Sequence, residues 1–211
     1  MATASMKRSA KDDKINLYTT PEWATQALID TGELDGCMSF WEPCCGMGHI
    51  SNVIIHNIEN RWTPGKTIAS TDLHDHGYEF GTPDIDFLMS NDIGADCVIT
   101  NPPFDRVGTH FSMLKHALSM PNVKKVCFFM PMQFLETPYR AKWLMDTECL
   151  VRVWSFADRV KCLTKGDESL SKDNTAKHFA WFVFEKNHYG DAAIGYLFKP
   201  DEMRRGKKNA K

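Results

Sequence analysis

The segment Asp96–Val107, DCVITNPPFDRV, places an asparagine, two prolines and an aromatic ring at the end of a predicted strand. Prolines carry no backbone N–H, fix their own φ and keep the preceding residue out of the helical region, so this tetrapeptide is rigid. The Asn101 side-chain oxygen and the Pro102 carbonyl are hydrogen-bond acceptors, and Phe104 offers a flat apolar face. Two converging acceptors beside a stacking surface suit an aromatic amine with two N–H groups.

A glycine-containing turn follows an earlier predicted strand, in the segment Phe40–Ser51. Glu42 ends the strand, and Gly46 and Gly48 lead into a predicted helix. Glycines let the backbone turn tightly and approach a ligand, and a helix N-terminus offers unpaired N–H groups. The pattern is GxGxxS rather than GxGxxG, so taken alone it is weak evidence of a nucleotide pocket.

Two acidic residues occupy further positions where a nucleoside could bind. Asp72 ends a predicted strand, where a carboxylate can accept both hydrogen bonds of a ribose diol; a helix cap or a solvated loop acid is the alternative. Asp86 precedes Phe87, which pairs an acceptor for an exocyclic amine with an aromatic ring, although one more buried strand would give the same pattern. His74 and His76 lie near Asp72, but no third ligand is indicated, so no metal site is predicted.

Hydrophobic periodicity predicts alternating helices and strands. Helices are expected at 20–32, with Thr20 as N-cap, Pro21 at the first helical position and Gly32 as the stop, and at 48–60, 108–120 and 139–148. Strands are expected at 38–43, 66–73, 96–101, 124–131, 150–156 and 178–186. This alternation predicts right-handed βαβ units, a mostly parallel sheet and an antiparallel pair at one edge. Ligands bind beyond the carboxyl ends of such strands, where the motifs above lie.

Composition indicates one soluble globular domain, because the chain has 211 residues and 43% of them are hydrophobic. No apolar run approaches the roughly 20 residues of a membrane span, and the N-terminus has no apolar signal region. Seven cysteines without a CxxC pair indicate reduced thiols, so a cytoplasmic location is expected, in a bacterial host cell if the protein is phage-encoded. The expected organisation is a flexible N-terminus at 1–14, one domain at 15–199 and a basic flexible tail at 200–211.

The net charge of −2 conceals two halves of opposite sign. Residues 1–104 carry 6 Lys and Arg against 15 Asp and Glu, which gives −9, and residues 105–211 carry 19 against 12, which gives +7. A basic C-terminal half is what binding to a polyanion requires, although a solvated lysine-rich tail would contribute to the same count.

The motifs together resemble those of a known family. EPCCGMG, an acidic strand end, DFL and then NPPF resemble the S-adenosylmethionine-dependent amino-methyltransferases, above all the adenine-N6 group, over residues 15–135. The strand AWFVFEK at 180–186 is similar to the edge strand of phage and prophage DNA adenine methyltransferases. The resemblance implies a Rossmann-like class I methyltransferase fold, α/β, with a mostly parallel seven-stranded sheet, an antiparallel edge strand and helices on both faces.

The same resemblance implies roles for individual residues. Asn101, Pro102, Pro103 and Phe104 would form the target pocket. The cofactor would be S-adenosylmethionine, with its adenine amine bonded to Asp86, its adenine ring against Phe87 and its ribose on Asp72. Its methionine portion would be surrounded by Glu42, Gly46 and Gly48, with Tyr18, Thr19 and Thr20 near the carboxylate.

The segment 157–178 is the candidate for contact with the target, because this chain leaves no room for a separate recognition domain. Its basic residues are Arg159, Lys161, Lys165, Lys172 and Lys177. The alternative is a mobile surface loop without a special role. If the segment does contact nucleic acid, the recognised sequence should be short or the specificity weak, unless a homodimer or another partner supplies the rest.

These expectations combine into one reaction. The predicted enzyme is a DNA adenine-N6 methyltransferase of phage or prophage type. It is expected to flip the target base out of the duplex and to transfer the methyl group directly. Neither a metal ion nor a membrane is expected as a partner. Adenine methylation of RNA, glutamine methylation of a protein and a non-catalytic nucleotide-binding interaction protein are the alternatives.

Overall fold

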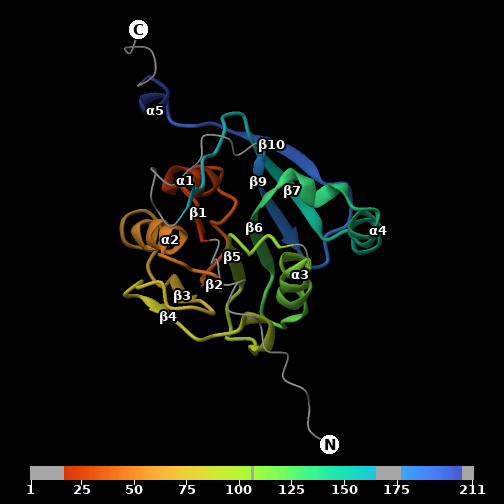
Figure 1. Cartoon of the computed structure of the whole chain (residues 1–211), viewed down its shortest axis with the longest axis horizontal. Coiled ribbons are helices and arrows are strands. Elements are labelled where there is room, and N and C mark those ends of the chain that lie inside the picture. The colour runs from red at the N-terminus through yellow and green to blue at the C-terminus, as the bar shows by residue number, and fades with distance from the viewer. Residues whose placement is uncertain (1–16, 106, 165–176, 206–211) are drawn as a thin grey trace, which may run out of the picture.

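An eight-stranded sheet runs through the centre of the computed structural model, which describes residues 17–105, 107–164 and 177–205 (Figure 1). Its strands are β2 (Ser39–Glu42), β3 (Thr67–Thr71), β4 (Gly81–Thr82), β5 (Cys97–Thr100), β6 (Lys125–Pro131), β7 (Leu150–Phe156), β9 (Phe179–Glu185) and β10 (Ala193–Leu197). The spatial order is β10-β7-β9-β6-β5-β2-β3-β4. Every neighbouring pair is parallel except those of β9, which is antiparallel to both β6 and β7.

Helices cover both faces of this sheet. Figure 1 shows α1 (Glu22–Asp30) and α2 (His49–Asn60) on one side, and α3 (Thr109–Ser119) and α4 (Pro138–Thr147) on the other. The shorter helical segments are the 3-10 turns η1 (Phe87–Met89) and η2 (Met132–Glu136) and the terminal α5 (Asp201–Arg205).

Two hydrophobic clusters, one on each face, hold the layers together. Successive residues of a strand point to opposite faces, so Val98 of β5 packs in the cluster under α3 while Ile99 packs in the cluster under α1 and α2. Phe128 and Phe129 of β6 divide in the same way, and both are fully buried. Burial on both faces explains why these strands are continuous apolar runs rather than alternating patterns.

The predicted mostly parallel sheet is confirmed, with two differences in detail. The described sheet has eight strands rather than seven, and the antiparallel β9 lies inside it rather than at an edge. The two edge strands, β4 and β10, lie outside the predicted strand ranges. Strand β4 has only two residues, and β10 pairs with β7 but exposes Ile194 and Tyr196, so neither has the apolar run that marks the buried strands. The predicted antiparallel contact of β7 with β9 is present.

The start of α1 also differs from the expected cap. Helix α1 begins at Glu22, with Pro21 at the N-cap position, and no side chain caps it, so Thr20 does not serve as the N-cap. Gly32 follows the C-cap residue Thr31 with φ of 80°, as expected of a glycine that ends a helix.

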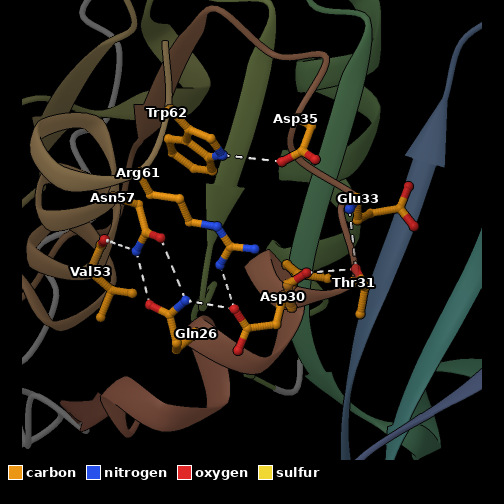
Figure 2. Close-up of polar contacts among 10 residues, drawn as sticks. Gln26, Asp30, Thr31, Glu33, Asp35, Val53, Asn57, Arg61 and Trp62 are labelled. Carbon is orange, nitrogen blue, oxygen red and sulfur yellow. Dashed lines mark hydrogen bonds and ion pairs between the residues drawn. The ribbon is translucent and has the colours of Figure 1, made fainter. Parts of the chain in front are cut away.

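Polar side chains fix α1 against α2, as Figure 2 shows. Asn57 of α2 donates to the Gln26 side chain of α1 at 2.9 Å and to the Val53 carbonyl at 2.8 Å, so its buried amide is satisfied. Arg61, just after α2, forms an ion pair with Asp30. These contacts hold α1 against α2 on one face of the sheet (Figure 1).

A second, two-stranded sheet forms from segments far apart in the chain. Strand β1 (Tyr18–Thr19) pairs antiparallel with β8 (Leu163–Thr164). No helix among the described residues has the length and apolar character to cross a membrane. The predicted flexible N-terminus, residues 1–14, lies outside the described residues, and 201–205 of the predicted tail form α5.

Candidate active site

A cavity of about 770 Å³ opens at the carboxyl ends of β2, β3, β5 and β6. It lies where the strand order reverses between β2 and β5, the place at which ligands bind in open parallel sheets. Its size is within the roughly 300–1,000 Å³ of small-molecule sites. Of the residues predicted from the sequence, those that line it are Tyr18, Thr19, Thr20, Glu42, Gly46, Asp72, Asp86, Phe87, Asn101, Pro102, Pro103 and Phe104.

Glu42 ends β2 as a buried acid, 1% exposed. Its carboxylate accepts from the Ser51 hydroxyl and backbone N–H in the first turn of α2, and the Ser51 hydroxyl oxygen lies 2.6 Å from that of Ser70. Burial, together with the charge of Asp72, outweighs these bonds and raises the pKa of Glu42 to about 8. Glu42 therefore binds its proton readily, and a cationic ligand in the cavity would favour its ionised form.

The glycine turn and Asp72 form one unit. The Asp72 carboxylate accepts from the Gly46 N–H at 2.8 Å and from the His74 N–H at 3.0 Å, which ties the turn after β2 to the loop after β3. Gly46 has φ of 52°, and a Cβ there would meet the Leu17 side chain at 2.9 Å. Each carboxylate oxygen retains a further lone pair for a ligand hydroxyl.

Gly48, in contrast, does not line the cavity. Its φ of 80° precedes the first residue of α2, and a Cβ at this position would lie 2.2 Å from the Tyr78 ring. The structure therefore explains this glycine by the conformation of the turn and the packing of Tyr78. The histidines at 74 and 76 stand beside Asp72, and His76 approaches it at 3.6 Å.

Asp86 and Phe87 enter the cavity from η1. The Asp86 side chain accepts from the Leu88 N–H at 2.9 Å and caps this short helix, which leaves its other oxygen exposed. Phe87 is held edge-on by Trp41 at 4.8 Å and by His116 at 5.1 Å between ring centroids. The predicted pair of an acceptor and an aromatic ring is thus present, on a 3-10 turn instead of a strand.

Asn101 is fixed by the segment that precedes α1. Its Nδ2 donates to the Tyr18 carbonyl at 3.0 Å and to the Thr20 hydroxyl oxygen at 3.1 Å. Both amide hydrogens are therefore used, and the Oδ1 of Asn101 remains as an acceptor. The next carbonyl, that of Pro102, receives no hydrogen bond from the described residues.

Phe104 borders the same end of the cavity and is 36% exposed. One face of its ring stacks on His110 at 4.0 Å and 10° between planes, a support that the sequence did not predict. His110 is 3% exposed, and neither ring nitrogen has a partner among the described residues. Burial, with the Arg140 charge, lowers the pKa of His110 to about 4, so a neutral imidazole supports the Phe104 ring.

The cavity is rich in negative charge. The carboxyl groups of Asp72, Asp86 and Asp105 line it, together with that of Glu42, whose pKa is raised to about 8, against the one Lys or Arg in the described lining, Lys177. Burial, with the charges of Glu42 and Asp72, raises the pKa of Cys45 to about 12. This lining favours a cationic ligand and leaves Cys45 a thiol, unsuited to attack as a thiolate.

Several lining residues were not predicted from the sequence, among them His49 at the start of α2, Met113 of α3, Cys162 within the 157–178 segment and Phe179 just after it. No local motif marks them, because tertiary packing alone brings them to the cavity. Lys177 also lines it, whereas Arg159 and Lys161 are exposed and do not, and Lys165 and Lys172 lie outside the described residues.

Comparison with solved structures finds this architecture in other proteins. A protein from Listeria monocytogenes assigned to the class I S-adenosylmethionine-dependent methyltransferases has a TM-score of 0.60 at 13% identity, over 87% of this chain and 67% of its own. The methyltransferase subunit of a type I restriction-modification system from Streptococcus thermophilus has a TM-score of 0.56 at 13% identity, and the match covers 90% of this chain and 50% of that subunit. This chain spans about half the length of that subunit.

A protein from Pyrococcus horikoshii assigned as an RNA methyltransferase has a TM-score of 0.56 at 14% identity, over 85% of this chain and 92% of its own. No protein-family model and no curated protein sequence matches the chain. At these identities the likeness concerns the fold. The chain therefore has the Rossmann-like fold of the class I methyltransferases.

Proposed function

We propose that the protein binds S-adenosylmethionine and transfers its methyl group to the exocyclic N6 amine of adenine in DNA. The observation that carries this proposal is the orientation of Asn101, whose acceptor oxygen remains available at the border of the cavity beside Phe104. The comparisons with methyltransferase folds support the same reaction class.

The described residues suit this cofactor. S-adenosylmethionine, when bound, supplies a methyl group on a positively charged sulfonium. The three aspartates of the cavity favour that charge, and the charge would in turn favour the ionised form of Glu42, which faces the methionine end in our proposal. Gly46 lies at the same methionine end, Asp72 holds the ribose hydroxyls, Asp86 accepts from the adenine amine and Phe87 packs on the adenine ring.

Asn101 and Pro102 act on the target amine. An aryl amine is a poor nucleophile because its lone pair is delocalised into the ring. If Asn101 Oδ1 and the Pro102 carbonyl each accept one N–H, the nitrogen becomes pyramidal and directs its lone pair at the methyl carbon. The N–C bond would form as the S–C bond breaks, the sulfur would leave as a neutral thioether with that electron pair, and one proton of the methylated amine would pass to water. Since positive charge develops on nitrogen, fixed acceptors stabilise the transition state more than the ground state.

Phe104 provides a platform for the target base. A base inside a duplex cannot reach such a cavity, so it must be flipped out or already single-stranded. The Phe104 face opposite His110 replaces the stacking that the base loses. Aromatic stacking of this kind contributes about 1–3 kcal/mol per base.

The polymer that carries the adenine is proposed to be DNA, on the resemblance of the motifs and the likeness to the restriction-modification subunit. RNA is the second candidate, favoured by the likeness to the Pyrococcus protein, which matches this chain over nearly its whole length. The segment 157–178 is proposed to contact the polymer, because two of its residues, Cys162 and Lys177, line the cavity.

The test is incubation with methyl-labelled S-adenosylmethionine and, in separate reactions, unmethylated DNA, RNA or protein, followed by digestion and product analysis. We expect label in N6-methyladenine from DNA. Label confined to RNA adenine would move the substrate to the second candidate, and label in glutamine would refute methylation of nucleic acid.

A further inference from the structure

The amide of Asn101 must present one particular end to the cavity for the proposed reaction. An asparagine side chain carries a donor nitrogen and an acceptor oxygen of nearly equal size, and rotation by 180° exchanges them. If the Asn101 side-chain nitrogen faced the target amine, the N–H donors of the amide would face the N–H donors of the amine and no hydrogen bond could form. Something in the protein must therefore select the rotamer that directs Oδ1 at the amine.

The Tyr18–Thr20 segment supplies that selection. The Tyr18 backbone oxygen can only accept a hydrogen bond, so its 3.0 Å contact identifies the neighbouring amide atom of Asn101 as nitrogen. The second amide hydrogen goes to the Thr20 hydroxyl oxygen at 3.1 Å. In the exchanged rotamer, Asn101 Oδ1 would face the Tyr18 carbonyl oxygen. Two acceptors would then lie at hydrogen-bonding distance without a proton between them, and they would repel each other.

The two acceptors are themselves fixed. Thr20 is 2% exposed and precedes Pro21, whose ring sets φ at −59°. Tyr18 lies in β1, which is paired with β8, and α1 begins a few residues later at Glu22. The backbone around the Tyr18 carbonyl is therefore held by the strand pairing before it and by the helix after it. Acceptors that are in place before the substrate arrives require no reorganisation during the reaction.

The hydroxyl of Thr20 has no role in capping α1, which receives no side-chain cap bond. Its contact with Asn101 joins residues 81 positions apart. Because the Thr20 hydroxyl does not cap α1, it is available to accept a hydrogen bond from Asn101.

We propose that Thr20 is a positioning residue that, with the Tyr18 carbonyl, holds the Asn101 amide with its oxygen toward the target amine. This inference rests on the proposed function for its catalytic consequence, while the hydrogen bond itself is independent of that function. Thr20 acts through Asn101 and needs no contact with the amine.

The kinetic test compares three variants. Thr20→Val keeps the shape but removes the acceptor, and Thr20→Ser restores a hydroxyl. Thr25→Val is the matched control, because Thr25 is 0% exposed and its hydroxyl has no partner among the described residues. We expect kcat of Thr20→Val to fall about five- to tenfold, the effect of one hydrogen bond, with KM for the polynucleotide little changed. Thr20→Ser should recover most of kcat, and Thr25→Val should equal wild type.

A second measurement does not depend on turnover. Asn101→Ala identifies the Asn101 side-chain NH₂ signals in nitrogen-edited NMR spectra, and their hydrogen exchange is compared between wild type and the Thr20 variants. Faster exchange and a shifted signal in Thr20→Val, reversed in Thr20→Ser, support the positioning contact even if the wild-type protein transfers no methyl group, a result that would refute only the proposed function. Unchanged Asn101 signals in Thr20→Val, or equal kcat in an active enzyme, would overturn the positioning role.

Discussion

The side-chain nitrogen of Asn101 lies 3.0 Å from the backbone oxygen of Tyr18, 83 positions earlier in the chain. This contact joins the segment Tyr18–Thr20 to the segment Asn101–Phe104 at one point of the cavity. The family resemblance implies that Tyr18, Thr19 and Thr20 lie near the methionine carboxylate of the cofactor. The hydrogen bonds show that the same segment also contacts the Asn101 side-chain amide, which faces the target in our proposal.

The protonation of Glu42 predicts an unusual pH dependence of stability. Burial raises its pKa from 4.5 to about 8, so between these values the unfolded chain is ionised at this residue while the folded protein retains a proton. The unfolded state then binds fewer protons, and stability falls as pH rises through this window. Glu42→Gln has no proton to lose.

We therefore expect the thermal unfolding midpoint of Glu42→Gln to fall less between pH 5 and about pH 8 than that of wild type. Calorimetry at several pH values measures this, with Glu59→Gln, an exposed position of α2, as the control. Parallel pH profiles for wild type and Glu42→Gln would show that Glu42 is ionised throughout the window.

Gly48 is predicted to be essential for stability rather than for ligand contact. Alanine at φ of 80° costs about 1–2 kcal/mol, and the Tyr78 ring 2.2 Å from its Cβ adds a steric cost. Gly94→Ala is the matched control, because its φ is 83° and no atom lies within 4 Å of the added Cβ.

Chemical denaturation should show a loss of about 1–2 kcal/mol for Gly94→Ala and a distinctly larger loss for Gly48→Ala. Equal losses would mean that Tyr78 moves aside freely. A loss of cofactor affinity in Gly48→Ala without any loss of stability would instead show that Gly48 takes part in cofactor binding, as the family resemblance implies.

Contact between the 157–178 segment and the polymer predicts a charge effect. Lys161→Glu should weaken polynucleotide binding and reduce the slope of log K against log salt by about 0.9, or about 0.7 for a single strand, and adding Lys165→Glu should increase both effects. Cofactor affinity should not change. Lys124→Glu, an exposed position at the amino end of β6, is the control.

Binding measured by fluorescence anisotropy at several salt concentrations separates the cases. If Lys161→Glu and Lys124→Glu weaken binding equally, the effect is one of net charge and the segment is not the contact. If neither variant changes binding, the polymer approaches the cavity from another side.

The elements that position the site were predictable because their signals are local. The buried part of β6, residues 126–131, is a continuous apolar run, and the glycine turn and NPPF stand at strand ends where backbone chemistry is unusual. The cavity lining confirms that Glu42, Asp72 and Asn101 reach one place.

The features that escaped prediction depend on contacts between distant segments. The stacking of Phe104 on His110, the pairing of β1 with β8 and the bond from Asn101 to Thr20 leave no periodic pattern in the sequence. Thr20 illustrates the difficulty. Its position before Pro21 is typical of a helix cap, and only the fold shows that its hydroxyl accepts from a side chain 81 positions away.

In the proposed reaction, Asn101 activates an adenine amine for methyl transfer. This role is measured by the amount of N6-methyladenine in DNA incubated with S-adenosylmethionine and either wild type or Asn101→Ala, with cofactor affinity determined in parallel by calorimetry. We expect N6-methyladenine with wild type, a rate at least about 100-fold lower with Asn101→Ala, and nearly equal cofactor affinity. Equal rates for the two proteins, or no N6-methyladenine with wild type while cofactor binds, would contradict the proposed role of Asn101.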